Sequence, residues 1–466
     1  MNCIVDFHIH SCYSRATSRV LVPEYIGYWA CVKGVTIVGT GDCTHPRWLG
    51  ELREKLEDAG NGLYRLKKKY ALSGSGFPLP SGRREAYFIL TGEISSIYKK
   101  NGKVRRVHNL CVLPDFSAAK KLQKALAARG NIESDGRPIL GVDAKDILDI
   151  VLNSADGAYL IPAHIWTPWF SVLGDKGGFD SLEECFGDLT KHIFAVETGL
   201  SSDPPMNRRC SFLDNVRLVS NSDAHSPANI GREANIFTVE PGYASIYRAL
   251  RSGRGFPATI ECFPQQGKYY FDGHRNCNVC FSPRETVRHK GICPVCHKPL
   301  TIGVAHRVAE LSDRPGAHLP GNGKDNPGIC NRRENRGEQG GGFDDEKSES
   351  VALTTVELFS EEKVPHWTMN SASYSKIRDY YSTVPLPELI SGITGTAPSS
   401  QKTQHLYFEA IEKIGPELYT LLFSPPDEIK KAAGEQLSEA ISRLRKGKVY
   451  VKPGYDGVFG KVTVSR

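Results

Sequence analysis

Two histidines near the start of the chain have the spacing of a metal-binding pair. His8 and His10 stand two residues apart at the end of an apolar run, from Ile4 to Ile9, that predicts a buried strand. Side chains two apart on a strand point to the same face, so both imidazoles project together, with Asp6 behind them. Two converging imidazoles can bind one divalent ion, although a single pair is more often structural.

The same pattern recurs along the first 260 residues. Short apolar runs alternate with helical stretches, and most of these runs lead to a side chain that can bind metal. The further candidates are Asp42 with His45, then Glu93, His108, His164, Glu197, and Asp223 with His225. In parallel β/α barrels the functional residues gather at the carboxyl ends of the strands. We therefore expect these side chains to meet at one mouth of a β/α barrel.

The types of ligand predict the chemistry of this site. Imidazole with carboxylate suits zinc, manganese or iron better than calcium, which prefers oxygen ligands alone. There are more candidate ligands than one ion needs, so we expect two or three divalent ions (Zn, Mn or Mg), with Glu93 as a bridge between them. Clustered ions activate water and neutralise a phosphoryl group. The residues therefore predict hydrolysis of a phosphoester.

Residues close to these ligands are candidates for binding a nucleic acid. Trp166, Trp169 and Phe170 follow His164 and would stand at the mouth, where aromatic rings can stack on an extruded base. The alternative is that they only pack the loop. Arg15 lies close to the first histidine pair, and its guanidinium could clamp a phosphate.

Four cysteines form a second, separate pattern. Cys277-x2-Cys280 and Cys293-x2-Cys296 present four thiolates, the ligand set of a tetrahedral structural zinc site. Such a site would fold a short segment that has little core of its own. A closed four-sulfur site has no open position, so we do not expect it to be catalytic.

Composition limits the class of protein. The chain has 466 residues, 40% of them hydrophobic and 24% charged, which is typical of a soluble globular protein. We find no apolar run of membrane-spanning length and no signal peptide, and the other nine of the thirteen cysteines are scattered as reduced thiols are. These features predict a cytoplasmic protein without a membrane partner. The net charge of +7 permits a polyanionic partner without requiring one.

Changes in composition predict four parts. Residues 1–260 form the barrel and 261–314 the zinc-binding part; 315–383 are a low-complexity insert to which we assign no function. Residues 384–466 are mostly helical, with helices expected at 388–393, 402–414, 417–422 and 427–446, the last one ending at Gly447.

The ordered ligands resemble the motifs of the PHP (polymerase and histidinol phosphatase) superfamily. The resemblance is carried by Asp6-Phe7-His8-Ile9-His10, the Asp42 region, Glu93, His108, His164 and Asp223-Ala224-His225. It implies a distorted seven-stranded β/α barrel in which His8, His10, Glu93 and Asp223 hold one ion. Glu93, His108 and His164 would hold a second ion, and His225 with Asp42 a third. The chain departs from the superfamily where many members have a histidine, because it reads Ser14-Arg15-Ala16.

Longer runs resemble the endonuclease Q family within this superfamily. They are Gly39 to Pro46, Leu90 to Ser95, Pro162 to Phe170 and Ser220 to His225. The resemblance implies a DNA repair endonuclease that cuts 5′ to deaminated bases (uracil, hypoxanthine, xanthine) and at abasic sites in double- or single-stranded DNA. Asp6, His45 and Glu197 would then support the ligands from behind.

Other functions stay open at this stage. A small-molecule phosphatase of the same barrel superfamily and a non-catalytic protein that binds damaged DNA are the alternatives. A helicase is excluded, because the chain has no Gly-x4-Gly-Lys-Ser/Thr phosphate loop. The end of the chain has no recognisable sliding-clamp peptide, so we do not predict that partner.

Overall fold

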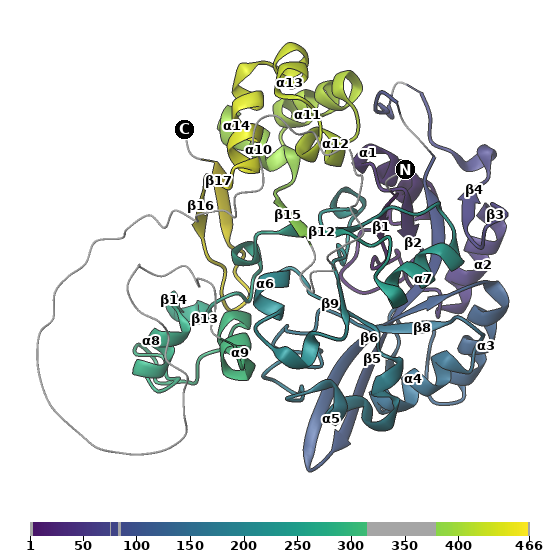
Figure 1. Ribbon diagram of the computed structural model, residues 1–466, viewed down its shortest axis with the longest axis vertical. Helices are drawn as coiled ribbons and strands as arrows, with labels where there is room; N and C mark the ends of the chain where they lie inside the picture. Colours follow the sequence, from purple (N-terminus) through teal and green to yellow (C-terminus); the bar gives the residue numbers. More distant parts are fainter. Residues whose placement is uncertain (1–2, 75, 83–84, 315–378, 465–466) are drawn as a thin grey trace, which may run out of the picture.

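The computed structural model describes residues 3–74, 76–82, 85–314 and 379–464 (Figure 1). The predicted insert at 315–383 lies outside the described residues, apart from its last five residues. Those five form strand β15 (Asp379–Thr383), which the sequence analysis did not assign. The described part of the chain therefore resumes with a strand that pairs in parallel with β12 (Ala258–Cys262) at one end of the path of the main sheet.

The main sheet is mixed, with parallel and antiparallel neighbours. Its path runs β15-β12-β11-β1-β2-β5-β4-β3; off this path, β6 and β7 pair with β5, and β8 pairs with β6. The bounds are β1 (Cys3–Asp6), β2 (Ile37–Gly39), β3 (Leu56–Asp58), β4 (Tyr64–Leu66), β5 (Tyr87–Lys100), β6 (Lys103–Leu113), β7 (Ile139–Leu140), β8 (Tyr159–Pro162), β11 (Ala234–Phe237) and β12 (Ala258–Cys262). β1, β2 and β5 are parallel, as expected for β/α units.

A long antiparallel hairpin departs from the predicted barrel. β6 pairs with β5 along its whole length, from Leu113 opposite Leu90 to Lys103 opposite Lys100. Glu93 and His108 therefore lie within the strands of this hairpin, and not at the carboxyl ends of parallel strands. β9 (Ala195–Glu197) and β10 (Arg217–Val219) form a separate parallel pair. The fold is mixed α/β, and the hydrogen bonds of the described residues do not form one parallel ring of seven strands.

Helices pack around this sheet (Figure 1), and several of them begin at a residue whose side chain caps the helix. They are α1 (Pro23–Lys33), α2 (Pro46–Lys55), α3 (Phe116–Ala127), α4 (Ala144–Leu152), α5 (Leu182–Phe186), α6 (Pro204–Asn207) and α7 (Tyr243–Ser252). Asp115 caps α3 by accepting from the backbone N–H of Ala118. α1 ends at Gly34, whose left-handed backbone (φ 84°) suits glycine.

The segment with the paired cysteines is small and has little apolar core. It contains β13 (Asp272–His274), β14 (Val279–Phe281), α8 (Pro283–Arg288) and α9 (Val304–Leu311), which lie to one side of the main sheet in Figure 1. Its own buried cluster consists of Val279, Cys293 and Leu300. So small a cluster cannot offset the entropy of ordering the segment, which is the situation in which a bound metal stabilises a fold.

The C-terminal part is helical, but it differs from the prediction in two places. Its helices are α10 (Leu386–Thr394), α11 (Gln401–Ile414), α12 (Glu417–Leu422), α13 (Pro426–Ala433) and α14 (Glu435–Arg445). The last expected helix is two helices, because Gly434 adopts φ 89° between them. After α14 the chain forms an antiparallel hairpin of β16 (Val449–Lys452) and β17 (Lys461–Val464).

The C-terminal helices pack on α1 at one end of the molecule (Figure 1). Tyr28 and Val32 of α1 share a buried cluster with Tyr407 and Ile411 of α11. The Lys33 ammonium lies 2.6 Å from Oε2 of Glu417, and both side chains are buried. No helix among the described residues is long and apolar enough to cross a membrane.

Candidate metal centre

Six of the predicted ligands lie in two groups of three. One group is His8, His10 and Asp223, and the other is Glu93, His108 and His164; within each group the ligand atoms lie within 4.8 Å of one another. The residues come from five separate stretches of the chain and are largely buried. The fold therefore brings together candidate ligands that lie far apart in the sequence.

Glu93 connects the two groups. One of its carboxylate oxygens, Oε1, lies 2.7 Å from His108 Nδ1 and 3.2 Å from His164 Nε2. The other oxygen, Oε2, lies 3.6 Å from His10 Nε2. Burial alone would raise the pKa of Glu93, but His108, His8 and Arg137 outweigh it and hold this pKa well below its usual range. An ionised carboxylate between two groups of imidazoles has the arrangement that a bridging ligand needs.

Two buried nitrogens in these groups have no hydrogen-bond partner within the part of the chain that the structure describes. They are Nε2 of His8 and Nδ1 of His108. His108 Nδ1 lies close to Glu93 without hydrogen-bond geometry, as two ligands of one ion do. Burial lowers the pKa of His108 to about 4, so its ring is neutral and has a lone pair to donate. Buried polar atoms normally find partners, so these orphan nitrogens fit divalent ions at both groups.

Glu197, at the end of β9, orients the ligands from behind. Its carboxylate accepts from Nδ1 of His8 at 3.0 Å, which leaves Nε2 of that ring facing the other ligands. It also accepts from the backbone N–H of His164 at 3.0 Å and from the side chain of Asn221 at 2.8 Å. A carboxylate behind a ligating histidine fixes its tautomer and raises its basicity.

Asp6 supports the site in a different way, by holding backbone. Its buried carboxyl accepts from the N–H of Ser222 at 3.1 Å and of Gly231 at 2.9 Å. Burial raises the pKa of Asp6 to about 6. These bonds fix the turn that presents Asp223.

Asp42 does not belong to either group. Its carboxylate accepts from the N–H of Ser11 at 2.7 Å and from the hydroxyls of Ser11 at 2.6 Å and Ser14 at 2.8 Å. Its other oxygen lies 3.3 Å from Nδ1 of His10, the nitrogen of that ring that faces away from Asp223. In this structure Asp42 thus orients His10 and is itself held by Ser11 and Ser14.

The other expected ligands of a third ion also lie apart. His225 is partly exposed, its Nδ1 donates to the carbonyl of Asp223 at 2.8 Å, and its ring lies 4.5 Å from that of His10. His45 caps α2 by accepting from the N–H of Trp48, and its Nε2 lies 3.1 Å from the carbonyl of Glu133. The described residues therefore contain no third group of ligands built on Asp42, His45 and His225.

The backbone around the centre is strained. Four residues other than glycine have positive φ angles here: His164 (29°), Asp223 (46°), Asp42 (47°) and Phe170 (60°). Each such conformation costs about 1–3 kcal/mol and persists only where the surroundings impose it. Their concentration here is typical of a functional site.

Arg137 is a member of the site that the sequence analysis missed. Its Nη1 donates to Oε2 of Glu93 at 3.1 Å. It lies in the loop between α3 and β7, outside the apolar runs that were used to find candidates. An arginine next to the run Pro138–Leu140 carries no periodic signal, so only the fold shows where it lies.

The predicted substrate-binding residues lie in different environments. Trp166 is buried, with 1% of its surface exposed, and donates to Oδ1 of Asn207 at 2.7 Å; it packs the core and has no free face for a base. Phe170 and Trp169 are partly exposed; the Phe170 ring lies 4.7 Å from that of His108. Arg15 is 72% exposed and lies 3.4 Å from Asp135.

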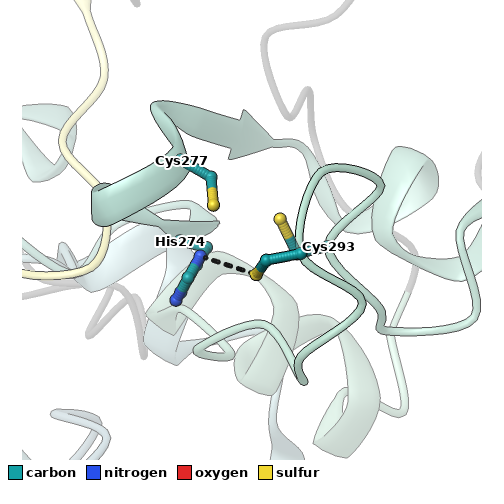
Figure 2. Close-up of side chains that lie close together, drawn as sticks. His274, Cys277 and Cys293 are labelled. Carbon is teal, nitrogen blue, oxygen red and sulfur yellow. Dashed lines mark hydrogen bonds between the residues drawn. The ribbon is translucent and has the colours of Figure 1, made fainter.

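The zinc segment brings together a ligand set different from the four predicted cysteines. His274, Cys277, Cys293 and Cys296 have ligand atoms within 4.8 Å of one another, and Figure 2 shows His274, Cys277 and Cys293 converging. Cys280 lies on β14 opposite Gly273, outside this group. Burial alone would raise the pKa of Cys293, but backbone N–H groups and neighbouring thiols lower it to about 7, which favours the thiolate. The signal for His274 was its spacing, His-x2-Cys-x2-Cys, in the sequence.

Comparison with known proteins extends over the whole chain. The structure is similar to that of the lesion-specific endonuclease PfuEndoQ from Pyrococcus furiosus, with a TM-score of 0.75, 26% identity, and coverage of 100% of this chain and 96% of that one. A structure of endonuclease Q with a 27-mer duplex carrying an abasic lesion at the active site matches at 27% identity and a TM-score of 0.75, over 100% of this chain and 97% of that one. The chain belongs to the endonuclease Q family.

Uncharacterized relatives and a family model agree with this membership of the endonuclease Q family. Residues 385–448 match the MJ0043 C-terminal domain model. YqxK of Bacillus subtilis is 33% identical over 298 residues, which are 62% of this chain and 69% of that protein. MJ0043 of Methanocaldococcus jannaschii is 28% identical over 307 residues; the match spans 64% of this chain but only 31% of that longer protein.

Proposed function

We propose that this protein is a DNA repair endonuclease that hydrolyses the phosphodiester 5′ to deaminated bases and abasic sites. The observation that carries the proposal is the pair of ligand groups joined by Glu93, in which two buried imidazole nitrogens have no other partner. The choice of damaged DNA as substrate is supported by the likeness to endonuclease Q, including its complex with a lesion duplex, along the whole chain.

The residues would hold two divalent ions. His8, His10 and Asp223 would bind one, His108 and His164 the other, and Glu93 would bridge them. The bound ions would supply an activated water and neutralise charge on the phosphoryl group. Hydrolysis adds the water oxygen to phosphorus and breaks one P–O ester bond; the sugar oxygen leaves with one proton of the water, and the other proton is released.

The protein's own groups orient this reaction. Glu197 and Asp42 fix the rings of His8 and His10, because each carboxylate lies at the Nδ1 nitrogen and leaves Nε2 toward the centre. Phe170 packs on His108 at the edge of the site and is the aromatic residue we assign to an extruded base. Trp169 lies beside Tyr269, at a ring distance of 5.5 Å, and would line the same mouth.

A cleavage assay on end-labelled duplexes tests the proposal. Each duplex carries one uracil, hypoxanthine, xanthine or abasic site, and a matched undamaged duplex serves as the control, with Mg²⁺ or Mn²⁺ present. We expect a nick 5′ to the lesion with the wild type and at least 10²-fold slower cleavage with Asp223→Asn, which removes a charged ligand. Asp188→Asn, at an exposed residue on the η2 turn (Gly187–His192), is the matched control and should cleave normally.

Other outcomes would contradict the proposal in defined ways. Turnover of histidinol phosphate without any nicking would assign the protein to the small-molecule phosphatases. Binding of lesion duplexes without cleavage, under every metal condition, would assign it to non-catalytic damage binders. Equal cleavage by the wild type and Asp223→Asn would show that the activity does not depend on this centre.

A further inference from the structure

A fixed positive charge lies over the carboxylate that joins the two ligand groups. Arg137 Nη1 donates to Oε2 of Glu93, which is fully buried, while 22% of the Arg137 side chain is exposed. The guanidinium therefore extends from the buried carboxylate to the solvent at the mouth. Among the described residues no hydrogen bond uses its Nε or Nη2 atoms. Two of its nitrogens thus remain available to a ligand.

The loop that carries Arg137 is held in place on both sides. The N–H of Arg137 donates to Oδ1 of Asp135 at 3.1 Å, and the N–H of Ser95 donates to the carbonyl of Pro138 at 2.9 Å. Ser95 lies two residues beyond Glu93 on β5, so the same strand positions both members of the ion pair. The guanidinium is therefore preorganised, and little entropy is lost when it binds an anion.

Gly136 brings this loop into direct contact with the part of the site where a third ion was expected. A Cβ atom at Gly136 would lie 2.3 Å from Oδ2 of Asp42 and 2.5 Å from the Ser14 hydroxyl. The N–H of Gly136 also donates to the carbonyl of Tyr13 at 3.0 Å. The loop thus fills the space beside Asp42, whose Oδ2 already accepts from Ser11 and Ser14 and whose Oδ1 faces Nδ1 of His10. The same loop brings the guanidinium of Arg137 to Glu93.

We propose that Arg137 is a catalytic residue that contacts the scissile phosphate. Its Nε and Nη2 groups would donate to a non-bridging oxygen while Nη1 stays on Glu93, and so stabilise the negative charge that grows on that oxygen as water attacks. A planar guanidinium suits this role because its donors match the spacing of phosphate oxygens. The inference rests on the proposed function, since it assumes that a phosphodiester is the substrate.

Single-turnover cleavage of an abasic-site duplex measures this role. Arg137→Met keeps the length of the side chain but removes its charge and donors. Arg129→Met is the matched control, because Arg129 is exposed and, among the described residues, its side chain donates only to the carbonyl of Ala125. We expect Arg137→Met to slow the chemical step about 10²- to 10³-fold. Binding of the duplex and the metal content of the purified protein should stay close to wild type. Millimolar guanidinium should restore part of the rate of Arg137→Ala.

Several results would overturn the role of Arg137. A rate within about threefold of Arg129→Met would show that it does not act in the chemical step. A defect that saturating Mn²⁺ abolishes, with low metal content, would show that Arg137 only balances Glu93.

A wild type that cuts no lesion duplex would instead overturn the proposed function. The same variants are then compared on bis-p-nitrophenyl phosphate, a phosphodiester without a base. On this substrate, a loss of rate in Arg137→Met relative to Arg129→Met supports the role of Arg137. Equal rates for the two variants, or no hydrolysis by the wild type, overturn that role.

Discussion

Glu197 shows how one residue outside the two proposed ligand groups can orient residues of both groups. It touches His8 through Nδ1 and His164 through the backbone, so one carboxylate positions one ligand from each group. The carboxylate is fully buried, and Asn221 uses part of its remaining capacity. Because ligand orientation depends on it, Glu197 should influence metal affinity more than the fold.

Glu197→Gln should weaken metal binding by about 10- to 100-fold, because the amide keeps the size of the side chain but loses its charge. Titration of the metal-free protein with Zn²⁺ or Mn²⁺ by calorimetry measures the affinity. Glu183→Gln, at an exposed position of α5, controls for the change from acid to amide. An affinity equal to that of this control would show that Glu197 does not support the ligands.

The zinc segment allows a test of whether His274 or Cys280 is the fourth zinc ligand. His274→Ala should lose the structural zinc, whereas Cys280→Ser should retain it, because His274 lies with the three cysteines and Cys280 does not. The zinc bound per molecule, counted beyond any metal of the proposed site around Glu93, provides the readout. Retention by His274→Ala together with loss by Cys280→Ser would favour the four-cysteine site.

At the scale of elements, a buried ion pair joins the C-terminal helices to α1. Glu417, the first residue of α12, accepts from Lys33 Nζ at 2.6 Å, from the Tyr407 hydroxyl at 2.6 Å and from the N–H of Leu386 at 3.0 Å. These bonds connect α1, α10, α11 and α12 through one carboxylate. Breaking one member of such a pair leaves the other charge buried.

Lys33→Met should therefore lower the free energy of unfolding by about 3 kcal/mol or more. The double variant Lys33→Met/Glu417→Gln should recover part of this loss, because it removes both charges. Urea denaturation measures both values. Lys430→Met, which breaks the exposed pair with Glu435, is the control and should change stability little. A loss equal to that of the control would show that the buried pair does not hold these elements together.

The elements also show where sequence patterns are sufficient. The apolar run from Ile4 to Ile9 correctly located β1, because a run of buried apolar residues is the main sequence signal of a short buried strand. The β5–β6 hairpin was not predicted, since strand direction depends on tertiary pairing and not on composition. The break at Gly434 was missed because one glycine within a helical pattern is often tolerated.

At the scale of the whole molecule, a buried carboxyl below the site couples stability to pH. Glu261 of β12 is fully buried, and its oxygens accept from Thr259 at 2.5 Å, Ser220 at 3.0 Å and Thr198 at 3.2 Å. Burial raises its pKa from 4.5 to about 8. The folded protein therefore holds this proton more tightly than the unfolded chain does.

The free energy of unfolding should accordingly fall as the pH rises from about 4.5 through 8, because the folded state must give up a proton that the unfolded state has already lost. Glu261→Gln keeps the size of the side chain and should make this dependence shallower. Denaturation of the metal-free protein at a series of pH values measures the slope. Identical slopes for both proteins would show that Glu261 does not titrate in this window.

The sequence predicted the candidate ligands better than it predicted the fold that brings them together. Each ligand in the two groups had a chemical signal, an imidazole or carboxylate near an apolar run. Asp42 and His225 had the same signal and lie outside both groups, because hydrogen bonds to serines and to backbone decide their places. Arg137 had no signal, since its role depends on a loop that only the complete fold places over Glu93.

Anomalous diffraction from crystals soaked in Mn²⁺ tests the two-ion centre most directly. We predict two peaks, one between His8, His10 and Asp223 and one between His108 and His164, with Glu93 touching both and Arg137 beside it without a peak. A peak held by Asp42 and His225, or no peak at either group at saturating Mn²⁺, would contradict a two-ion phosphodiesterase centre at this site.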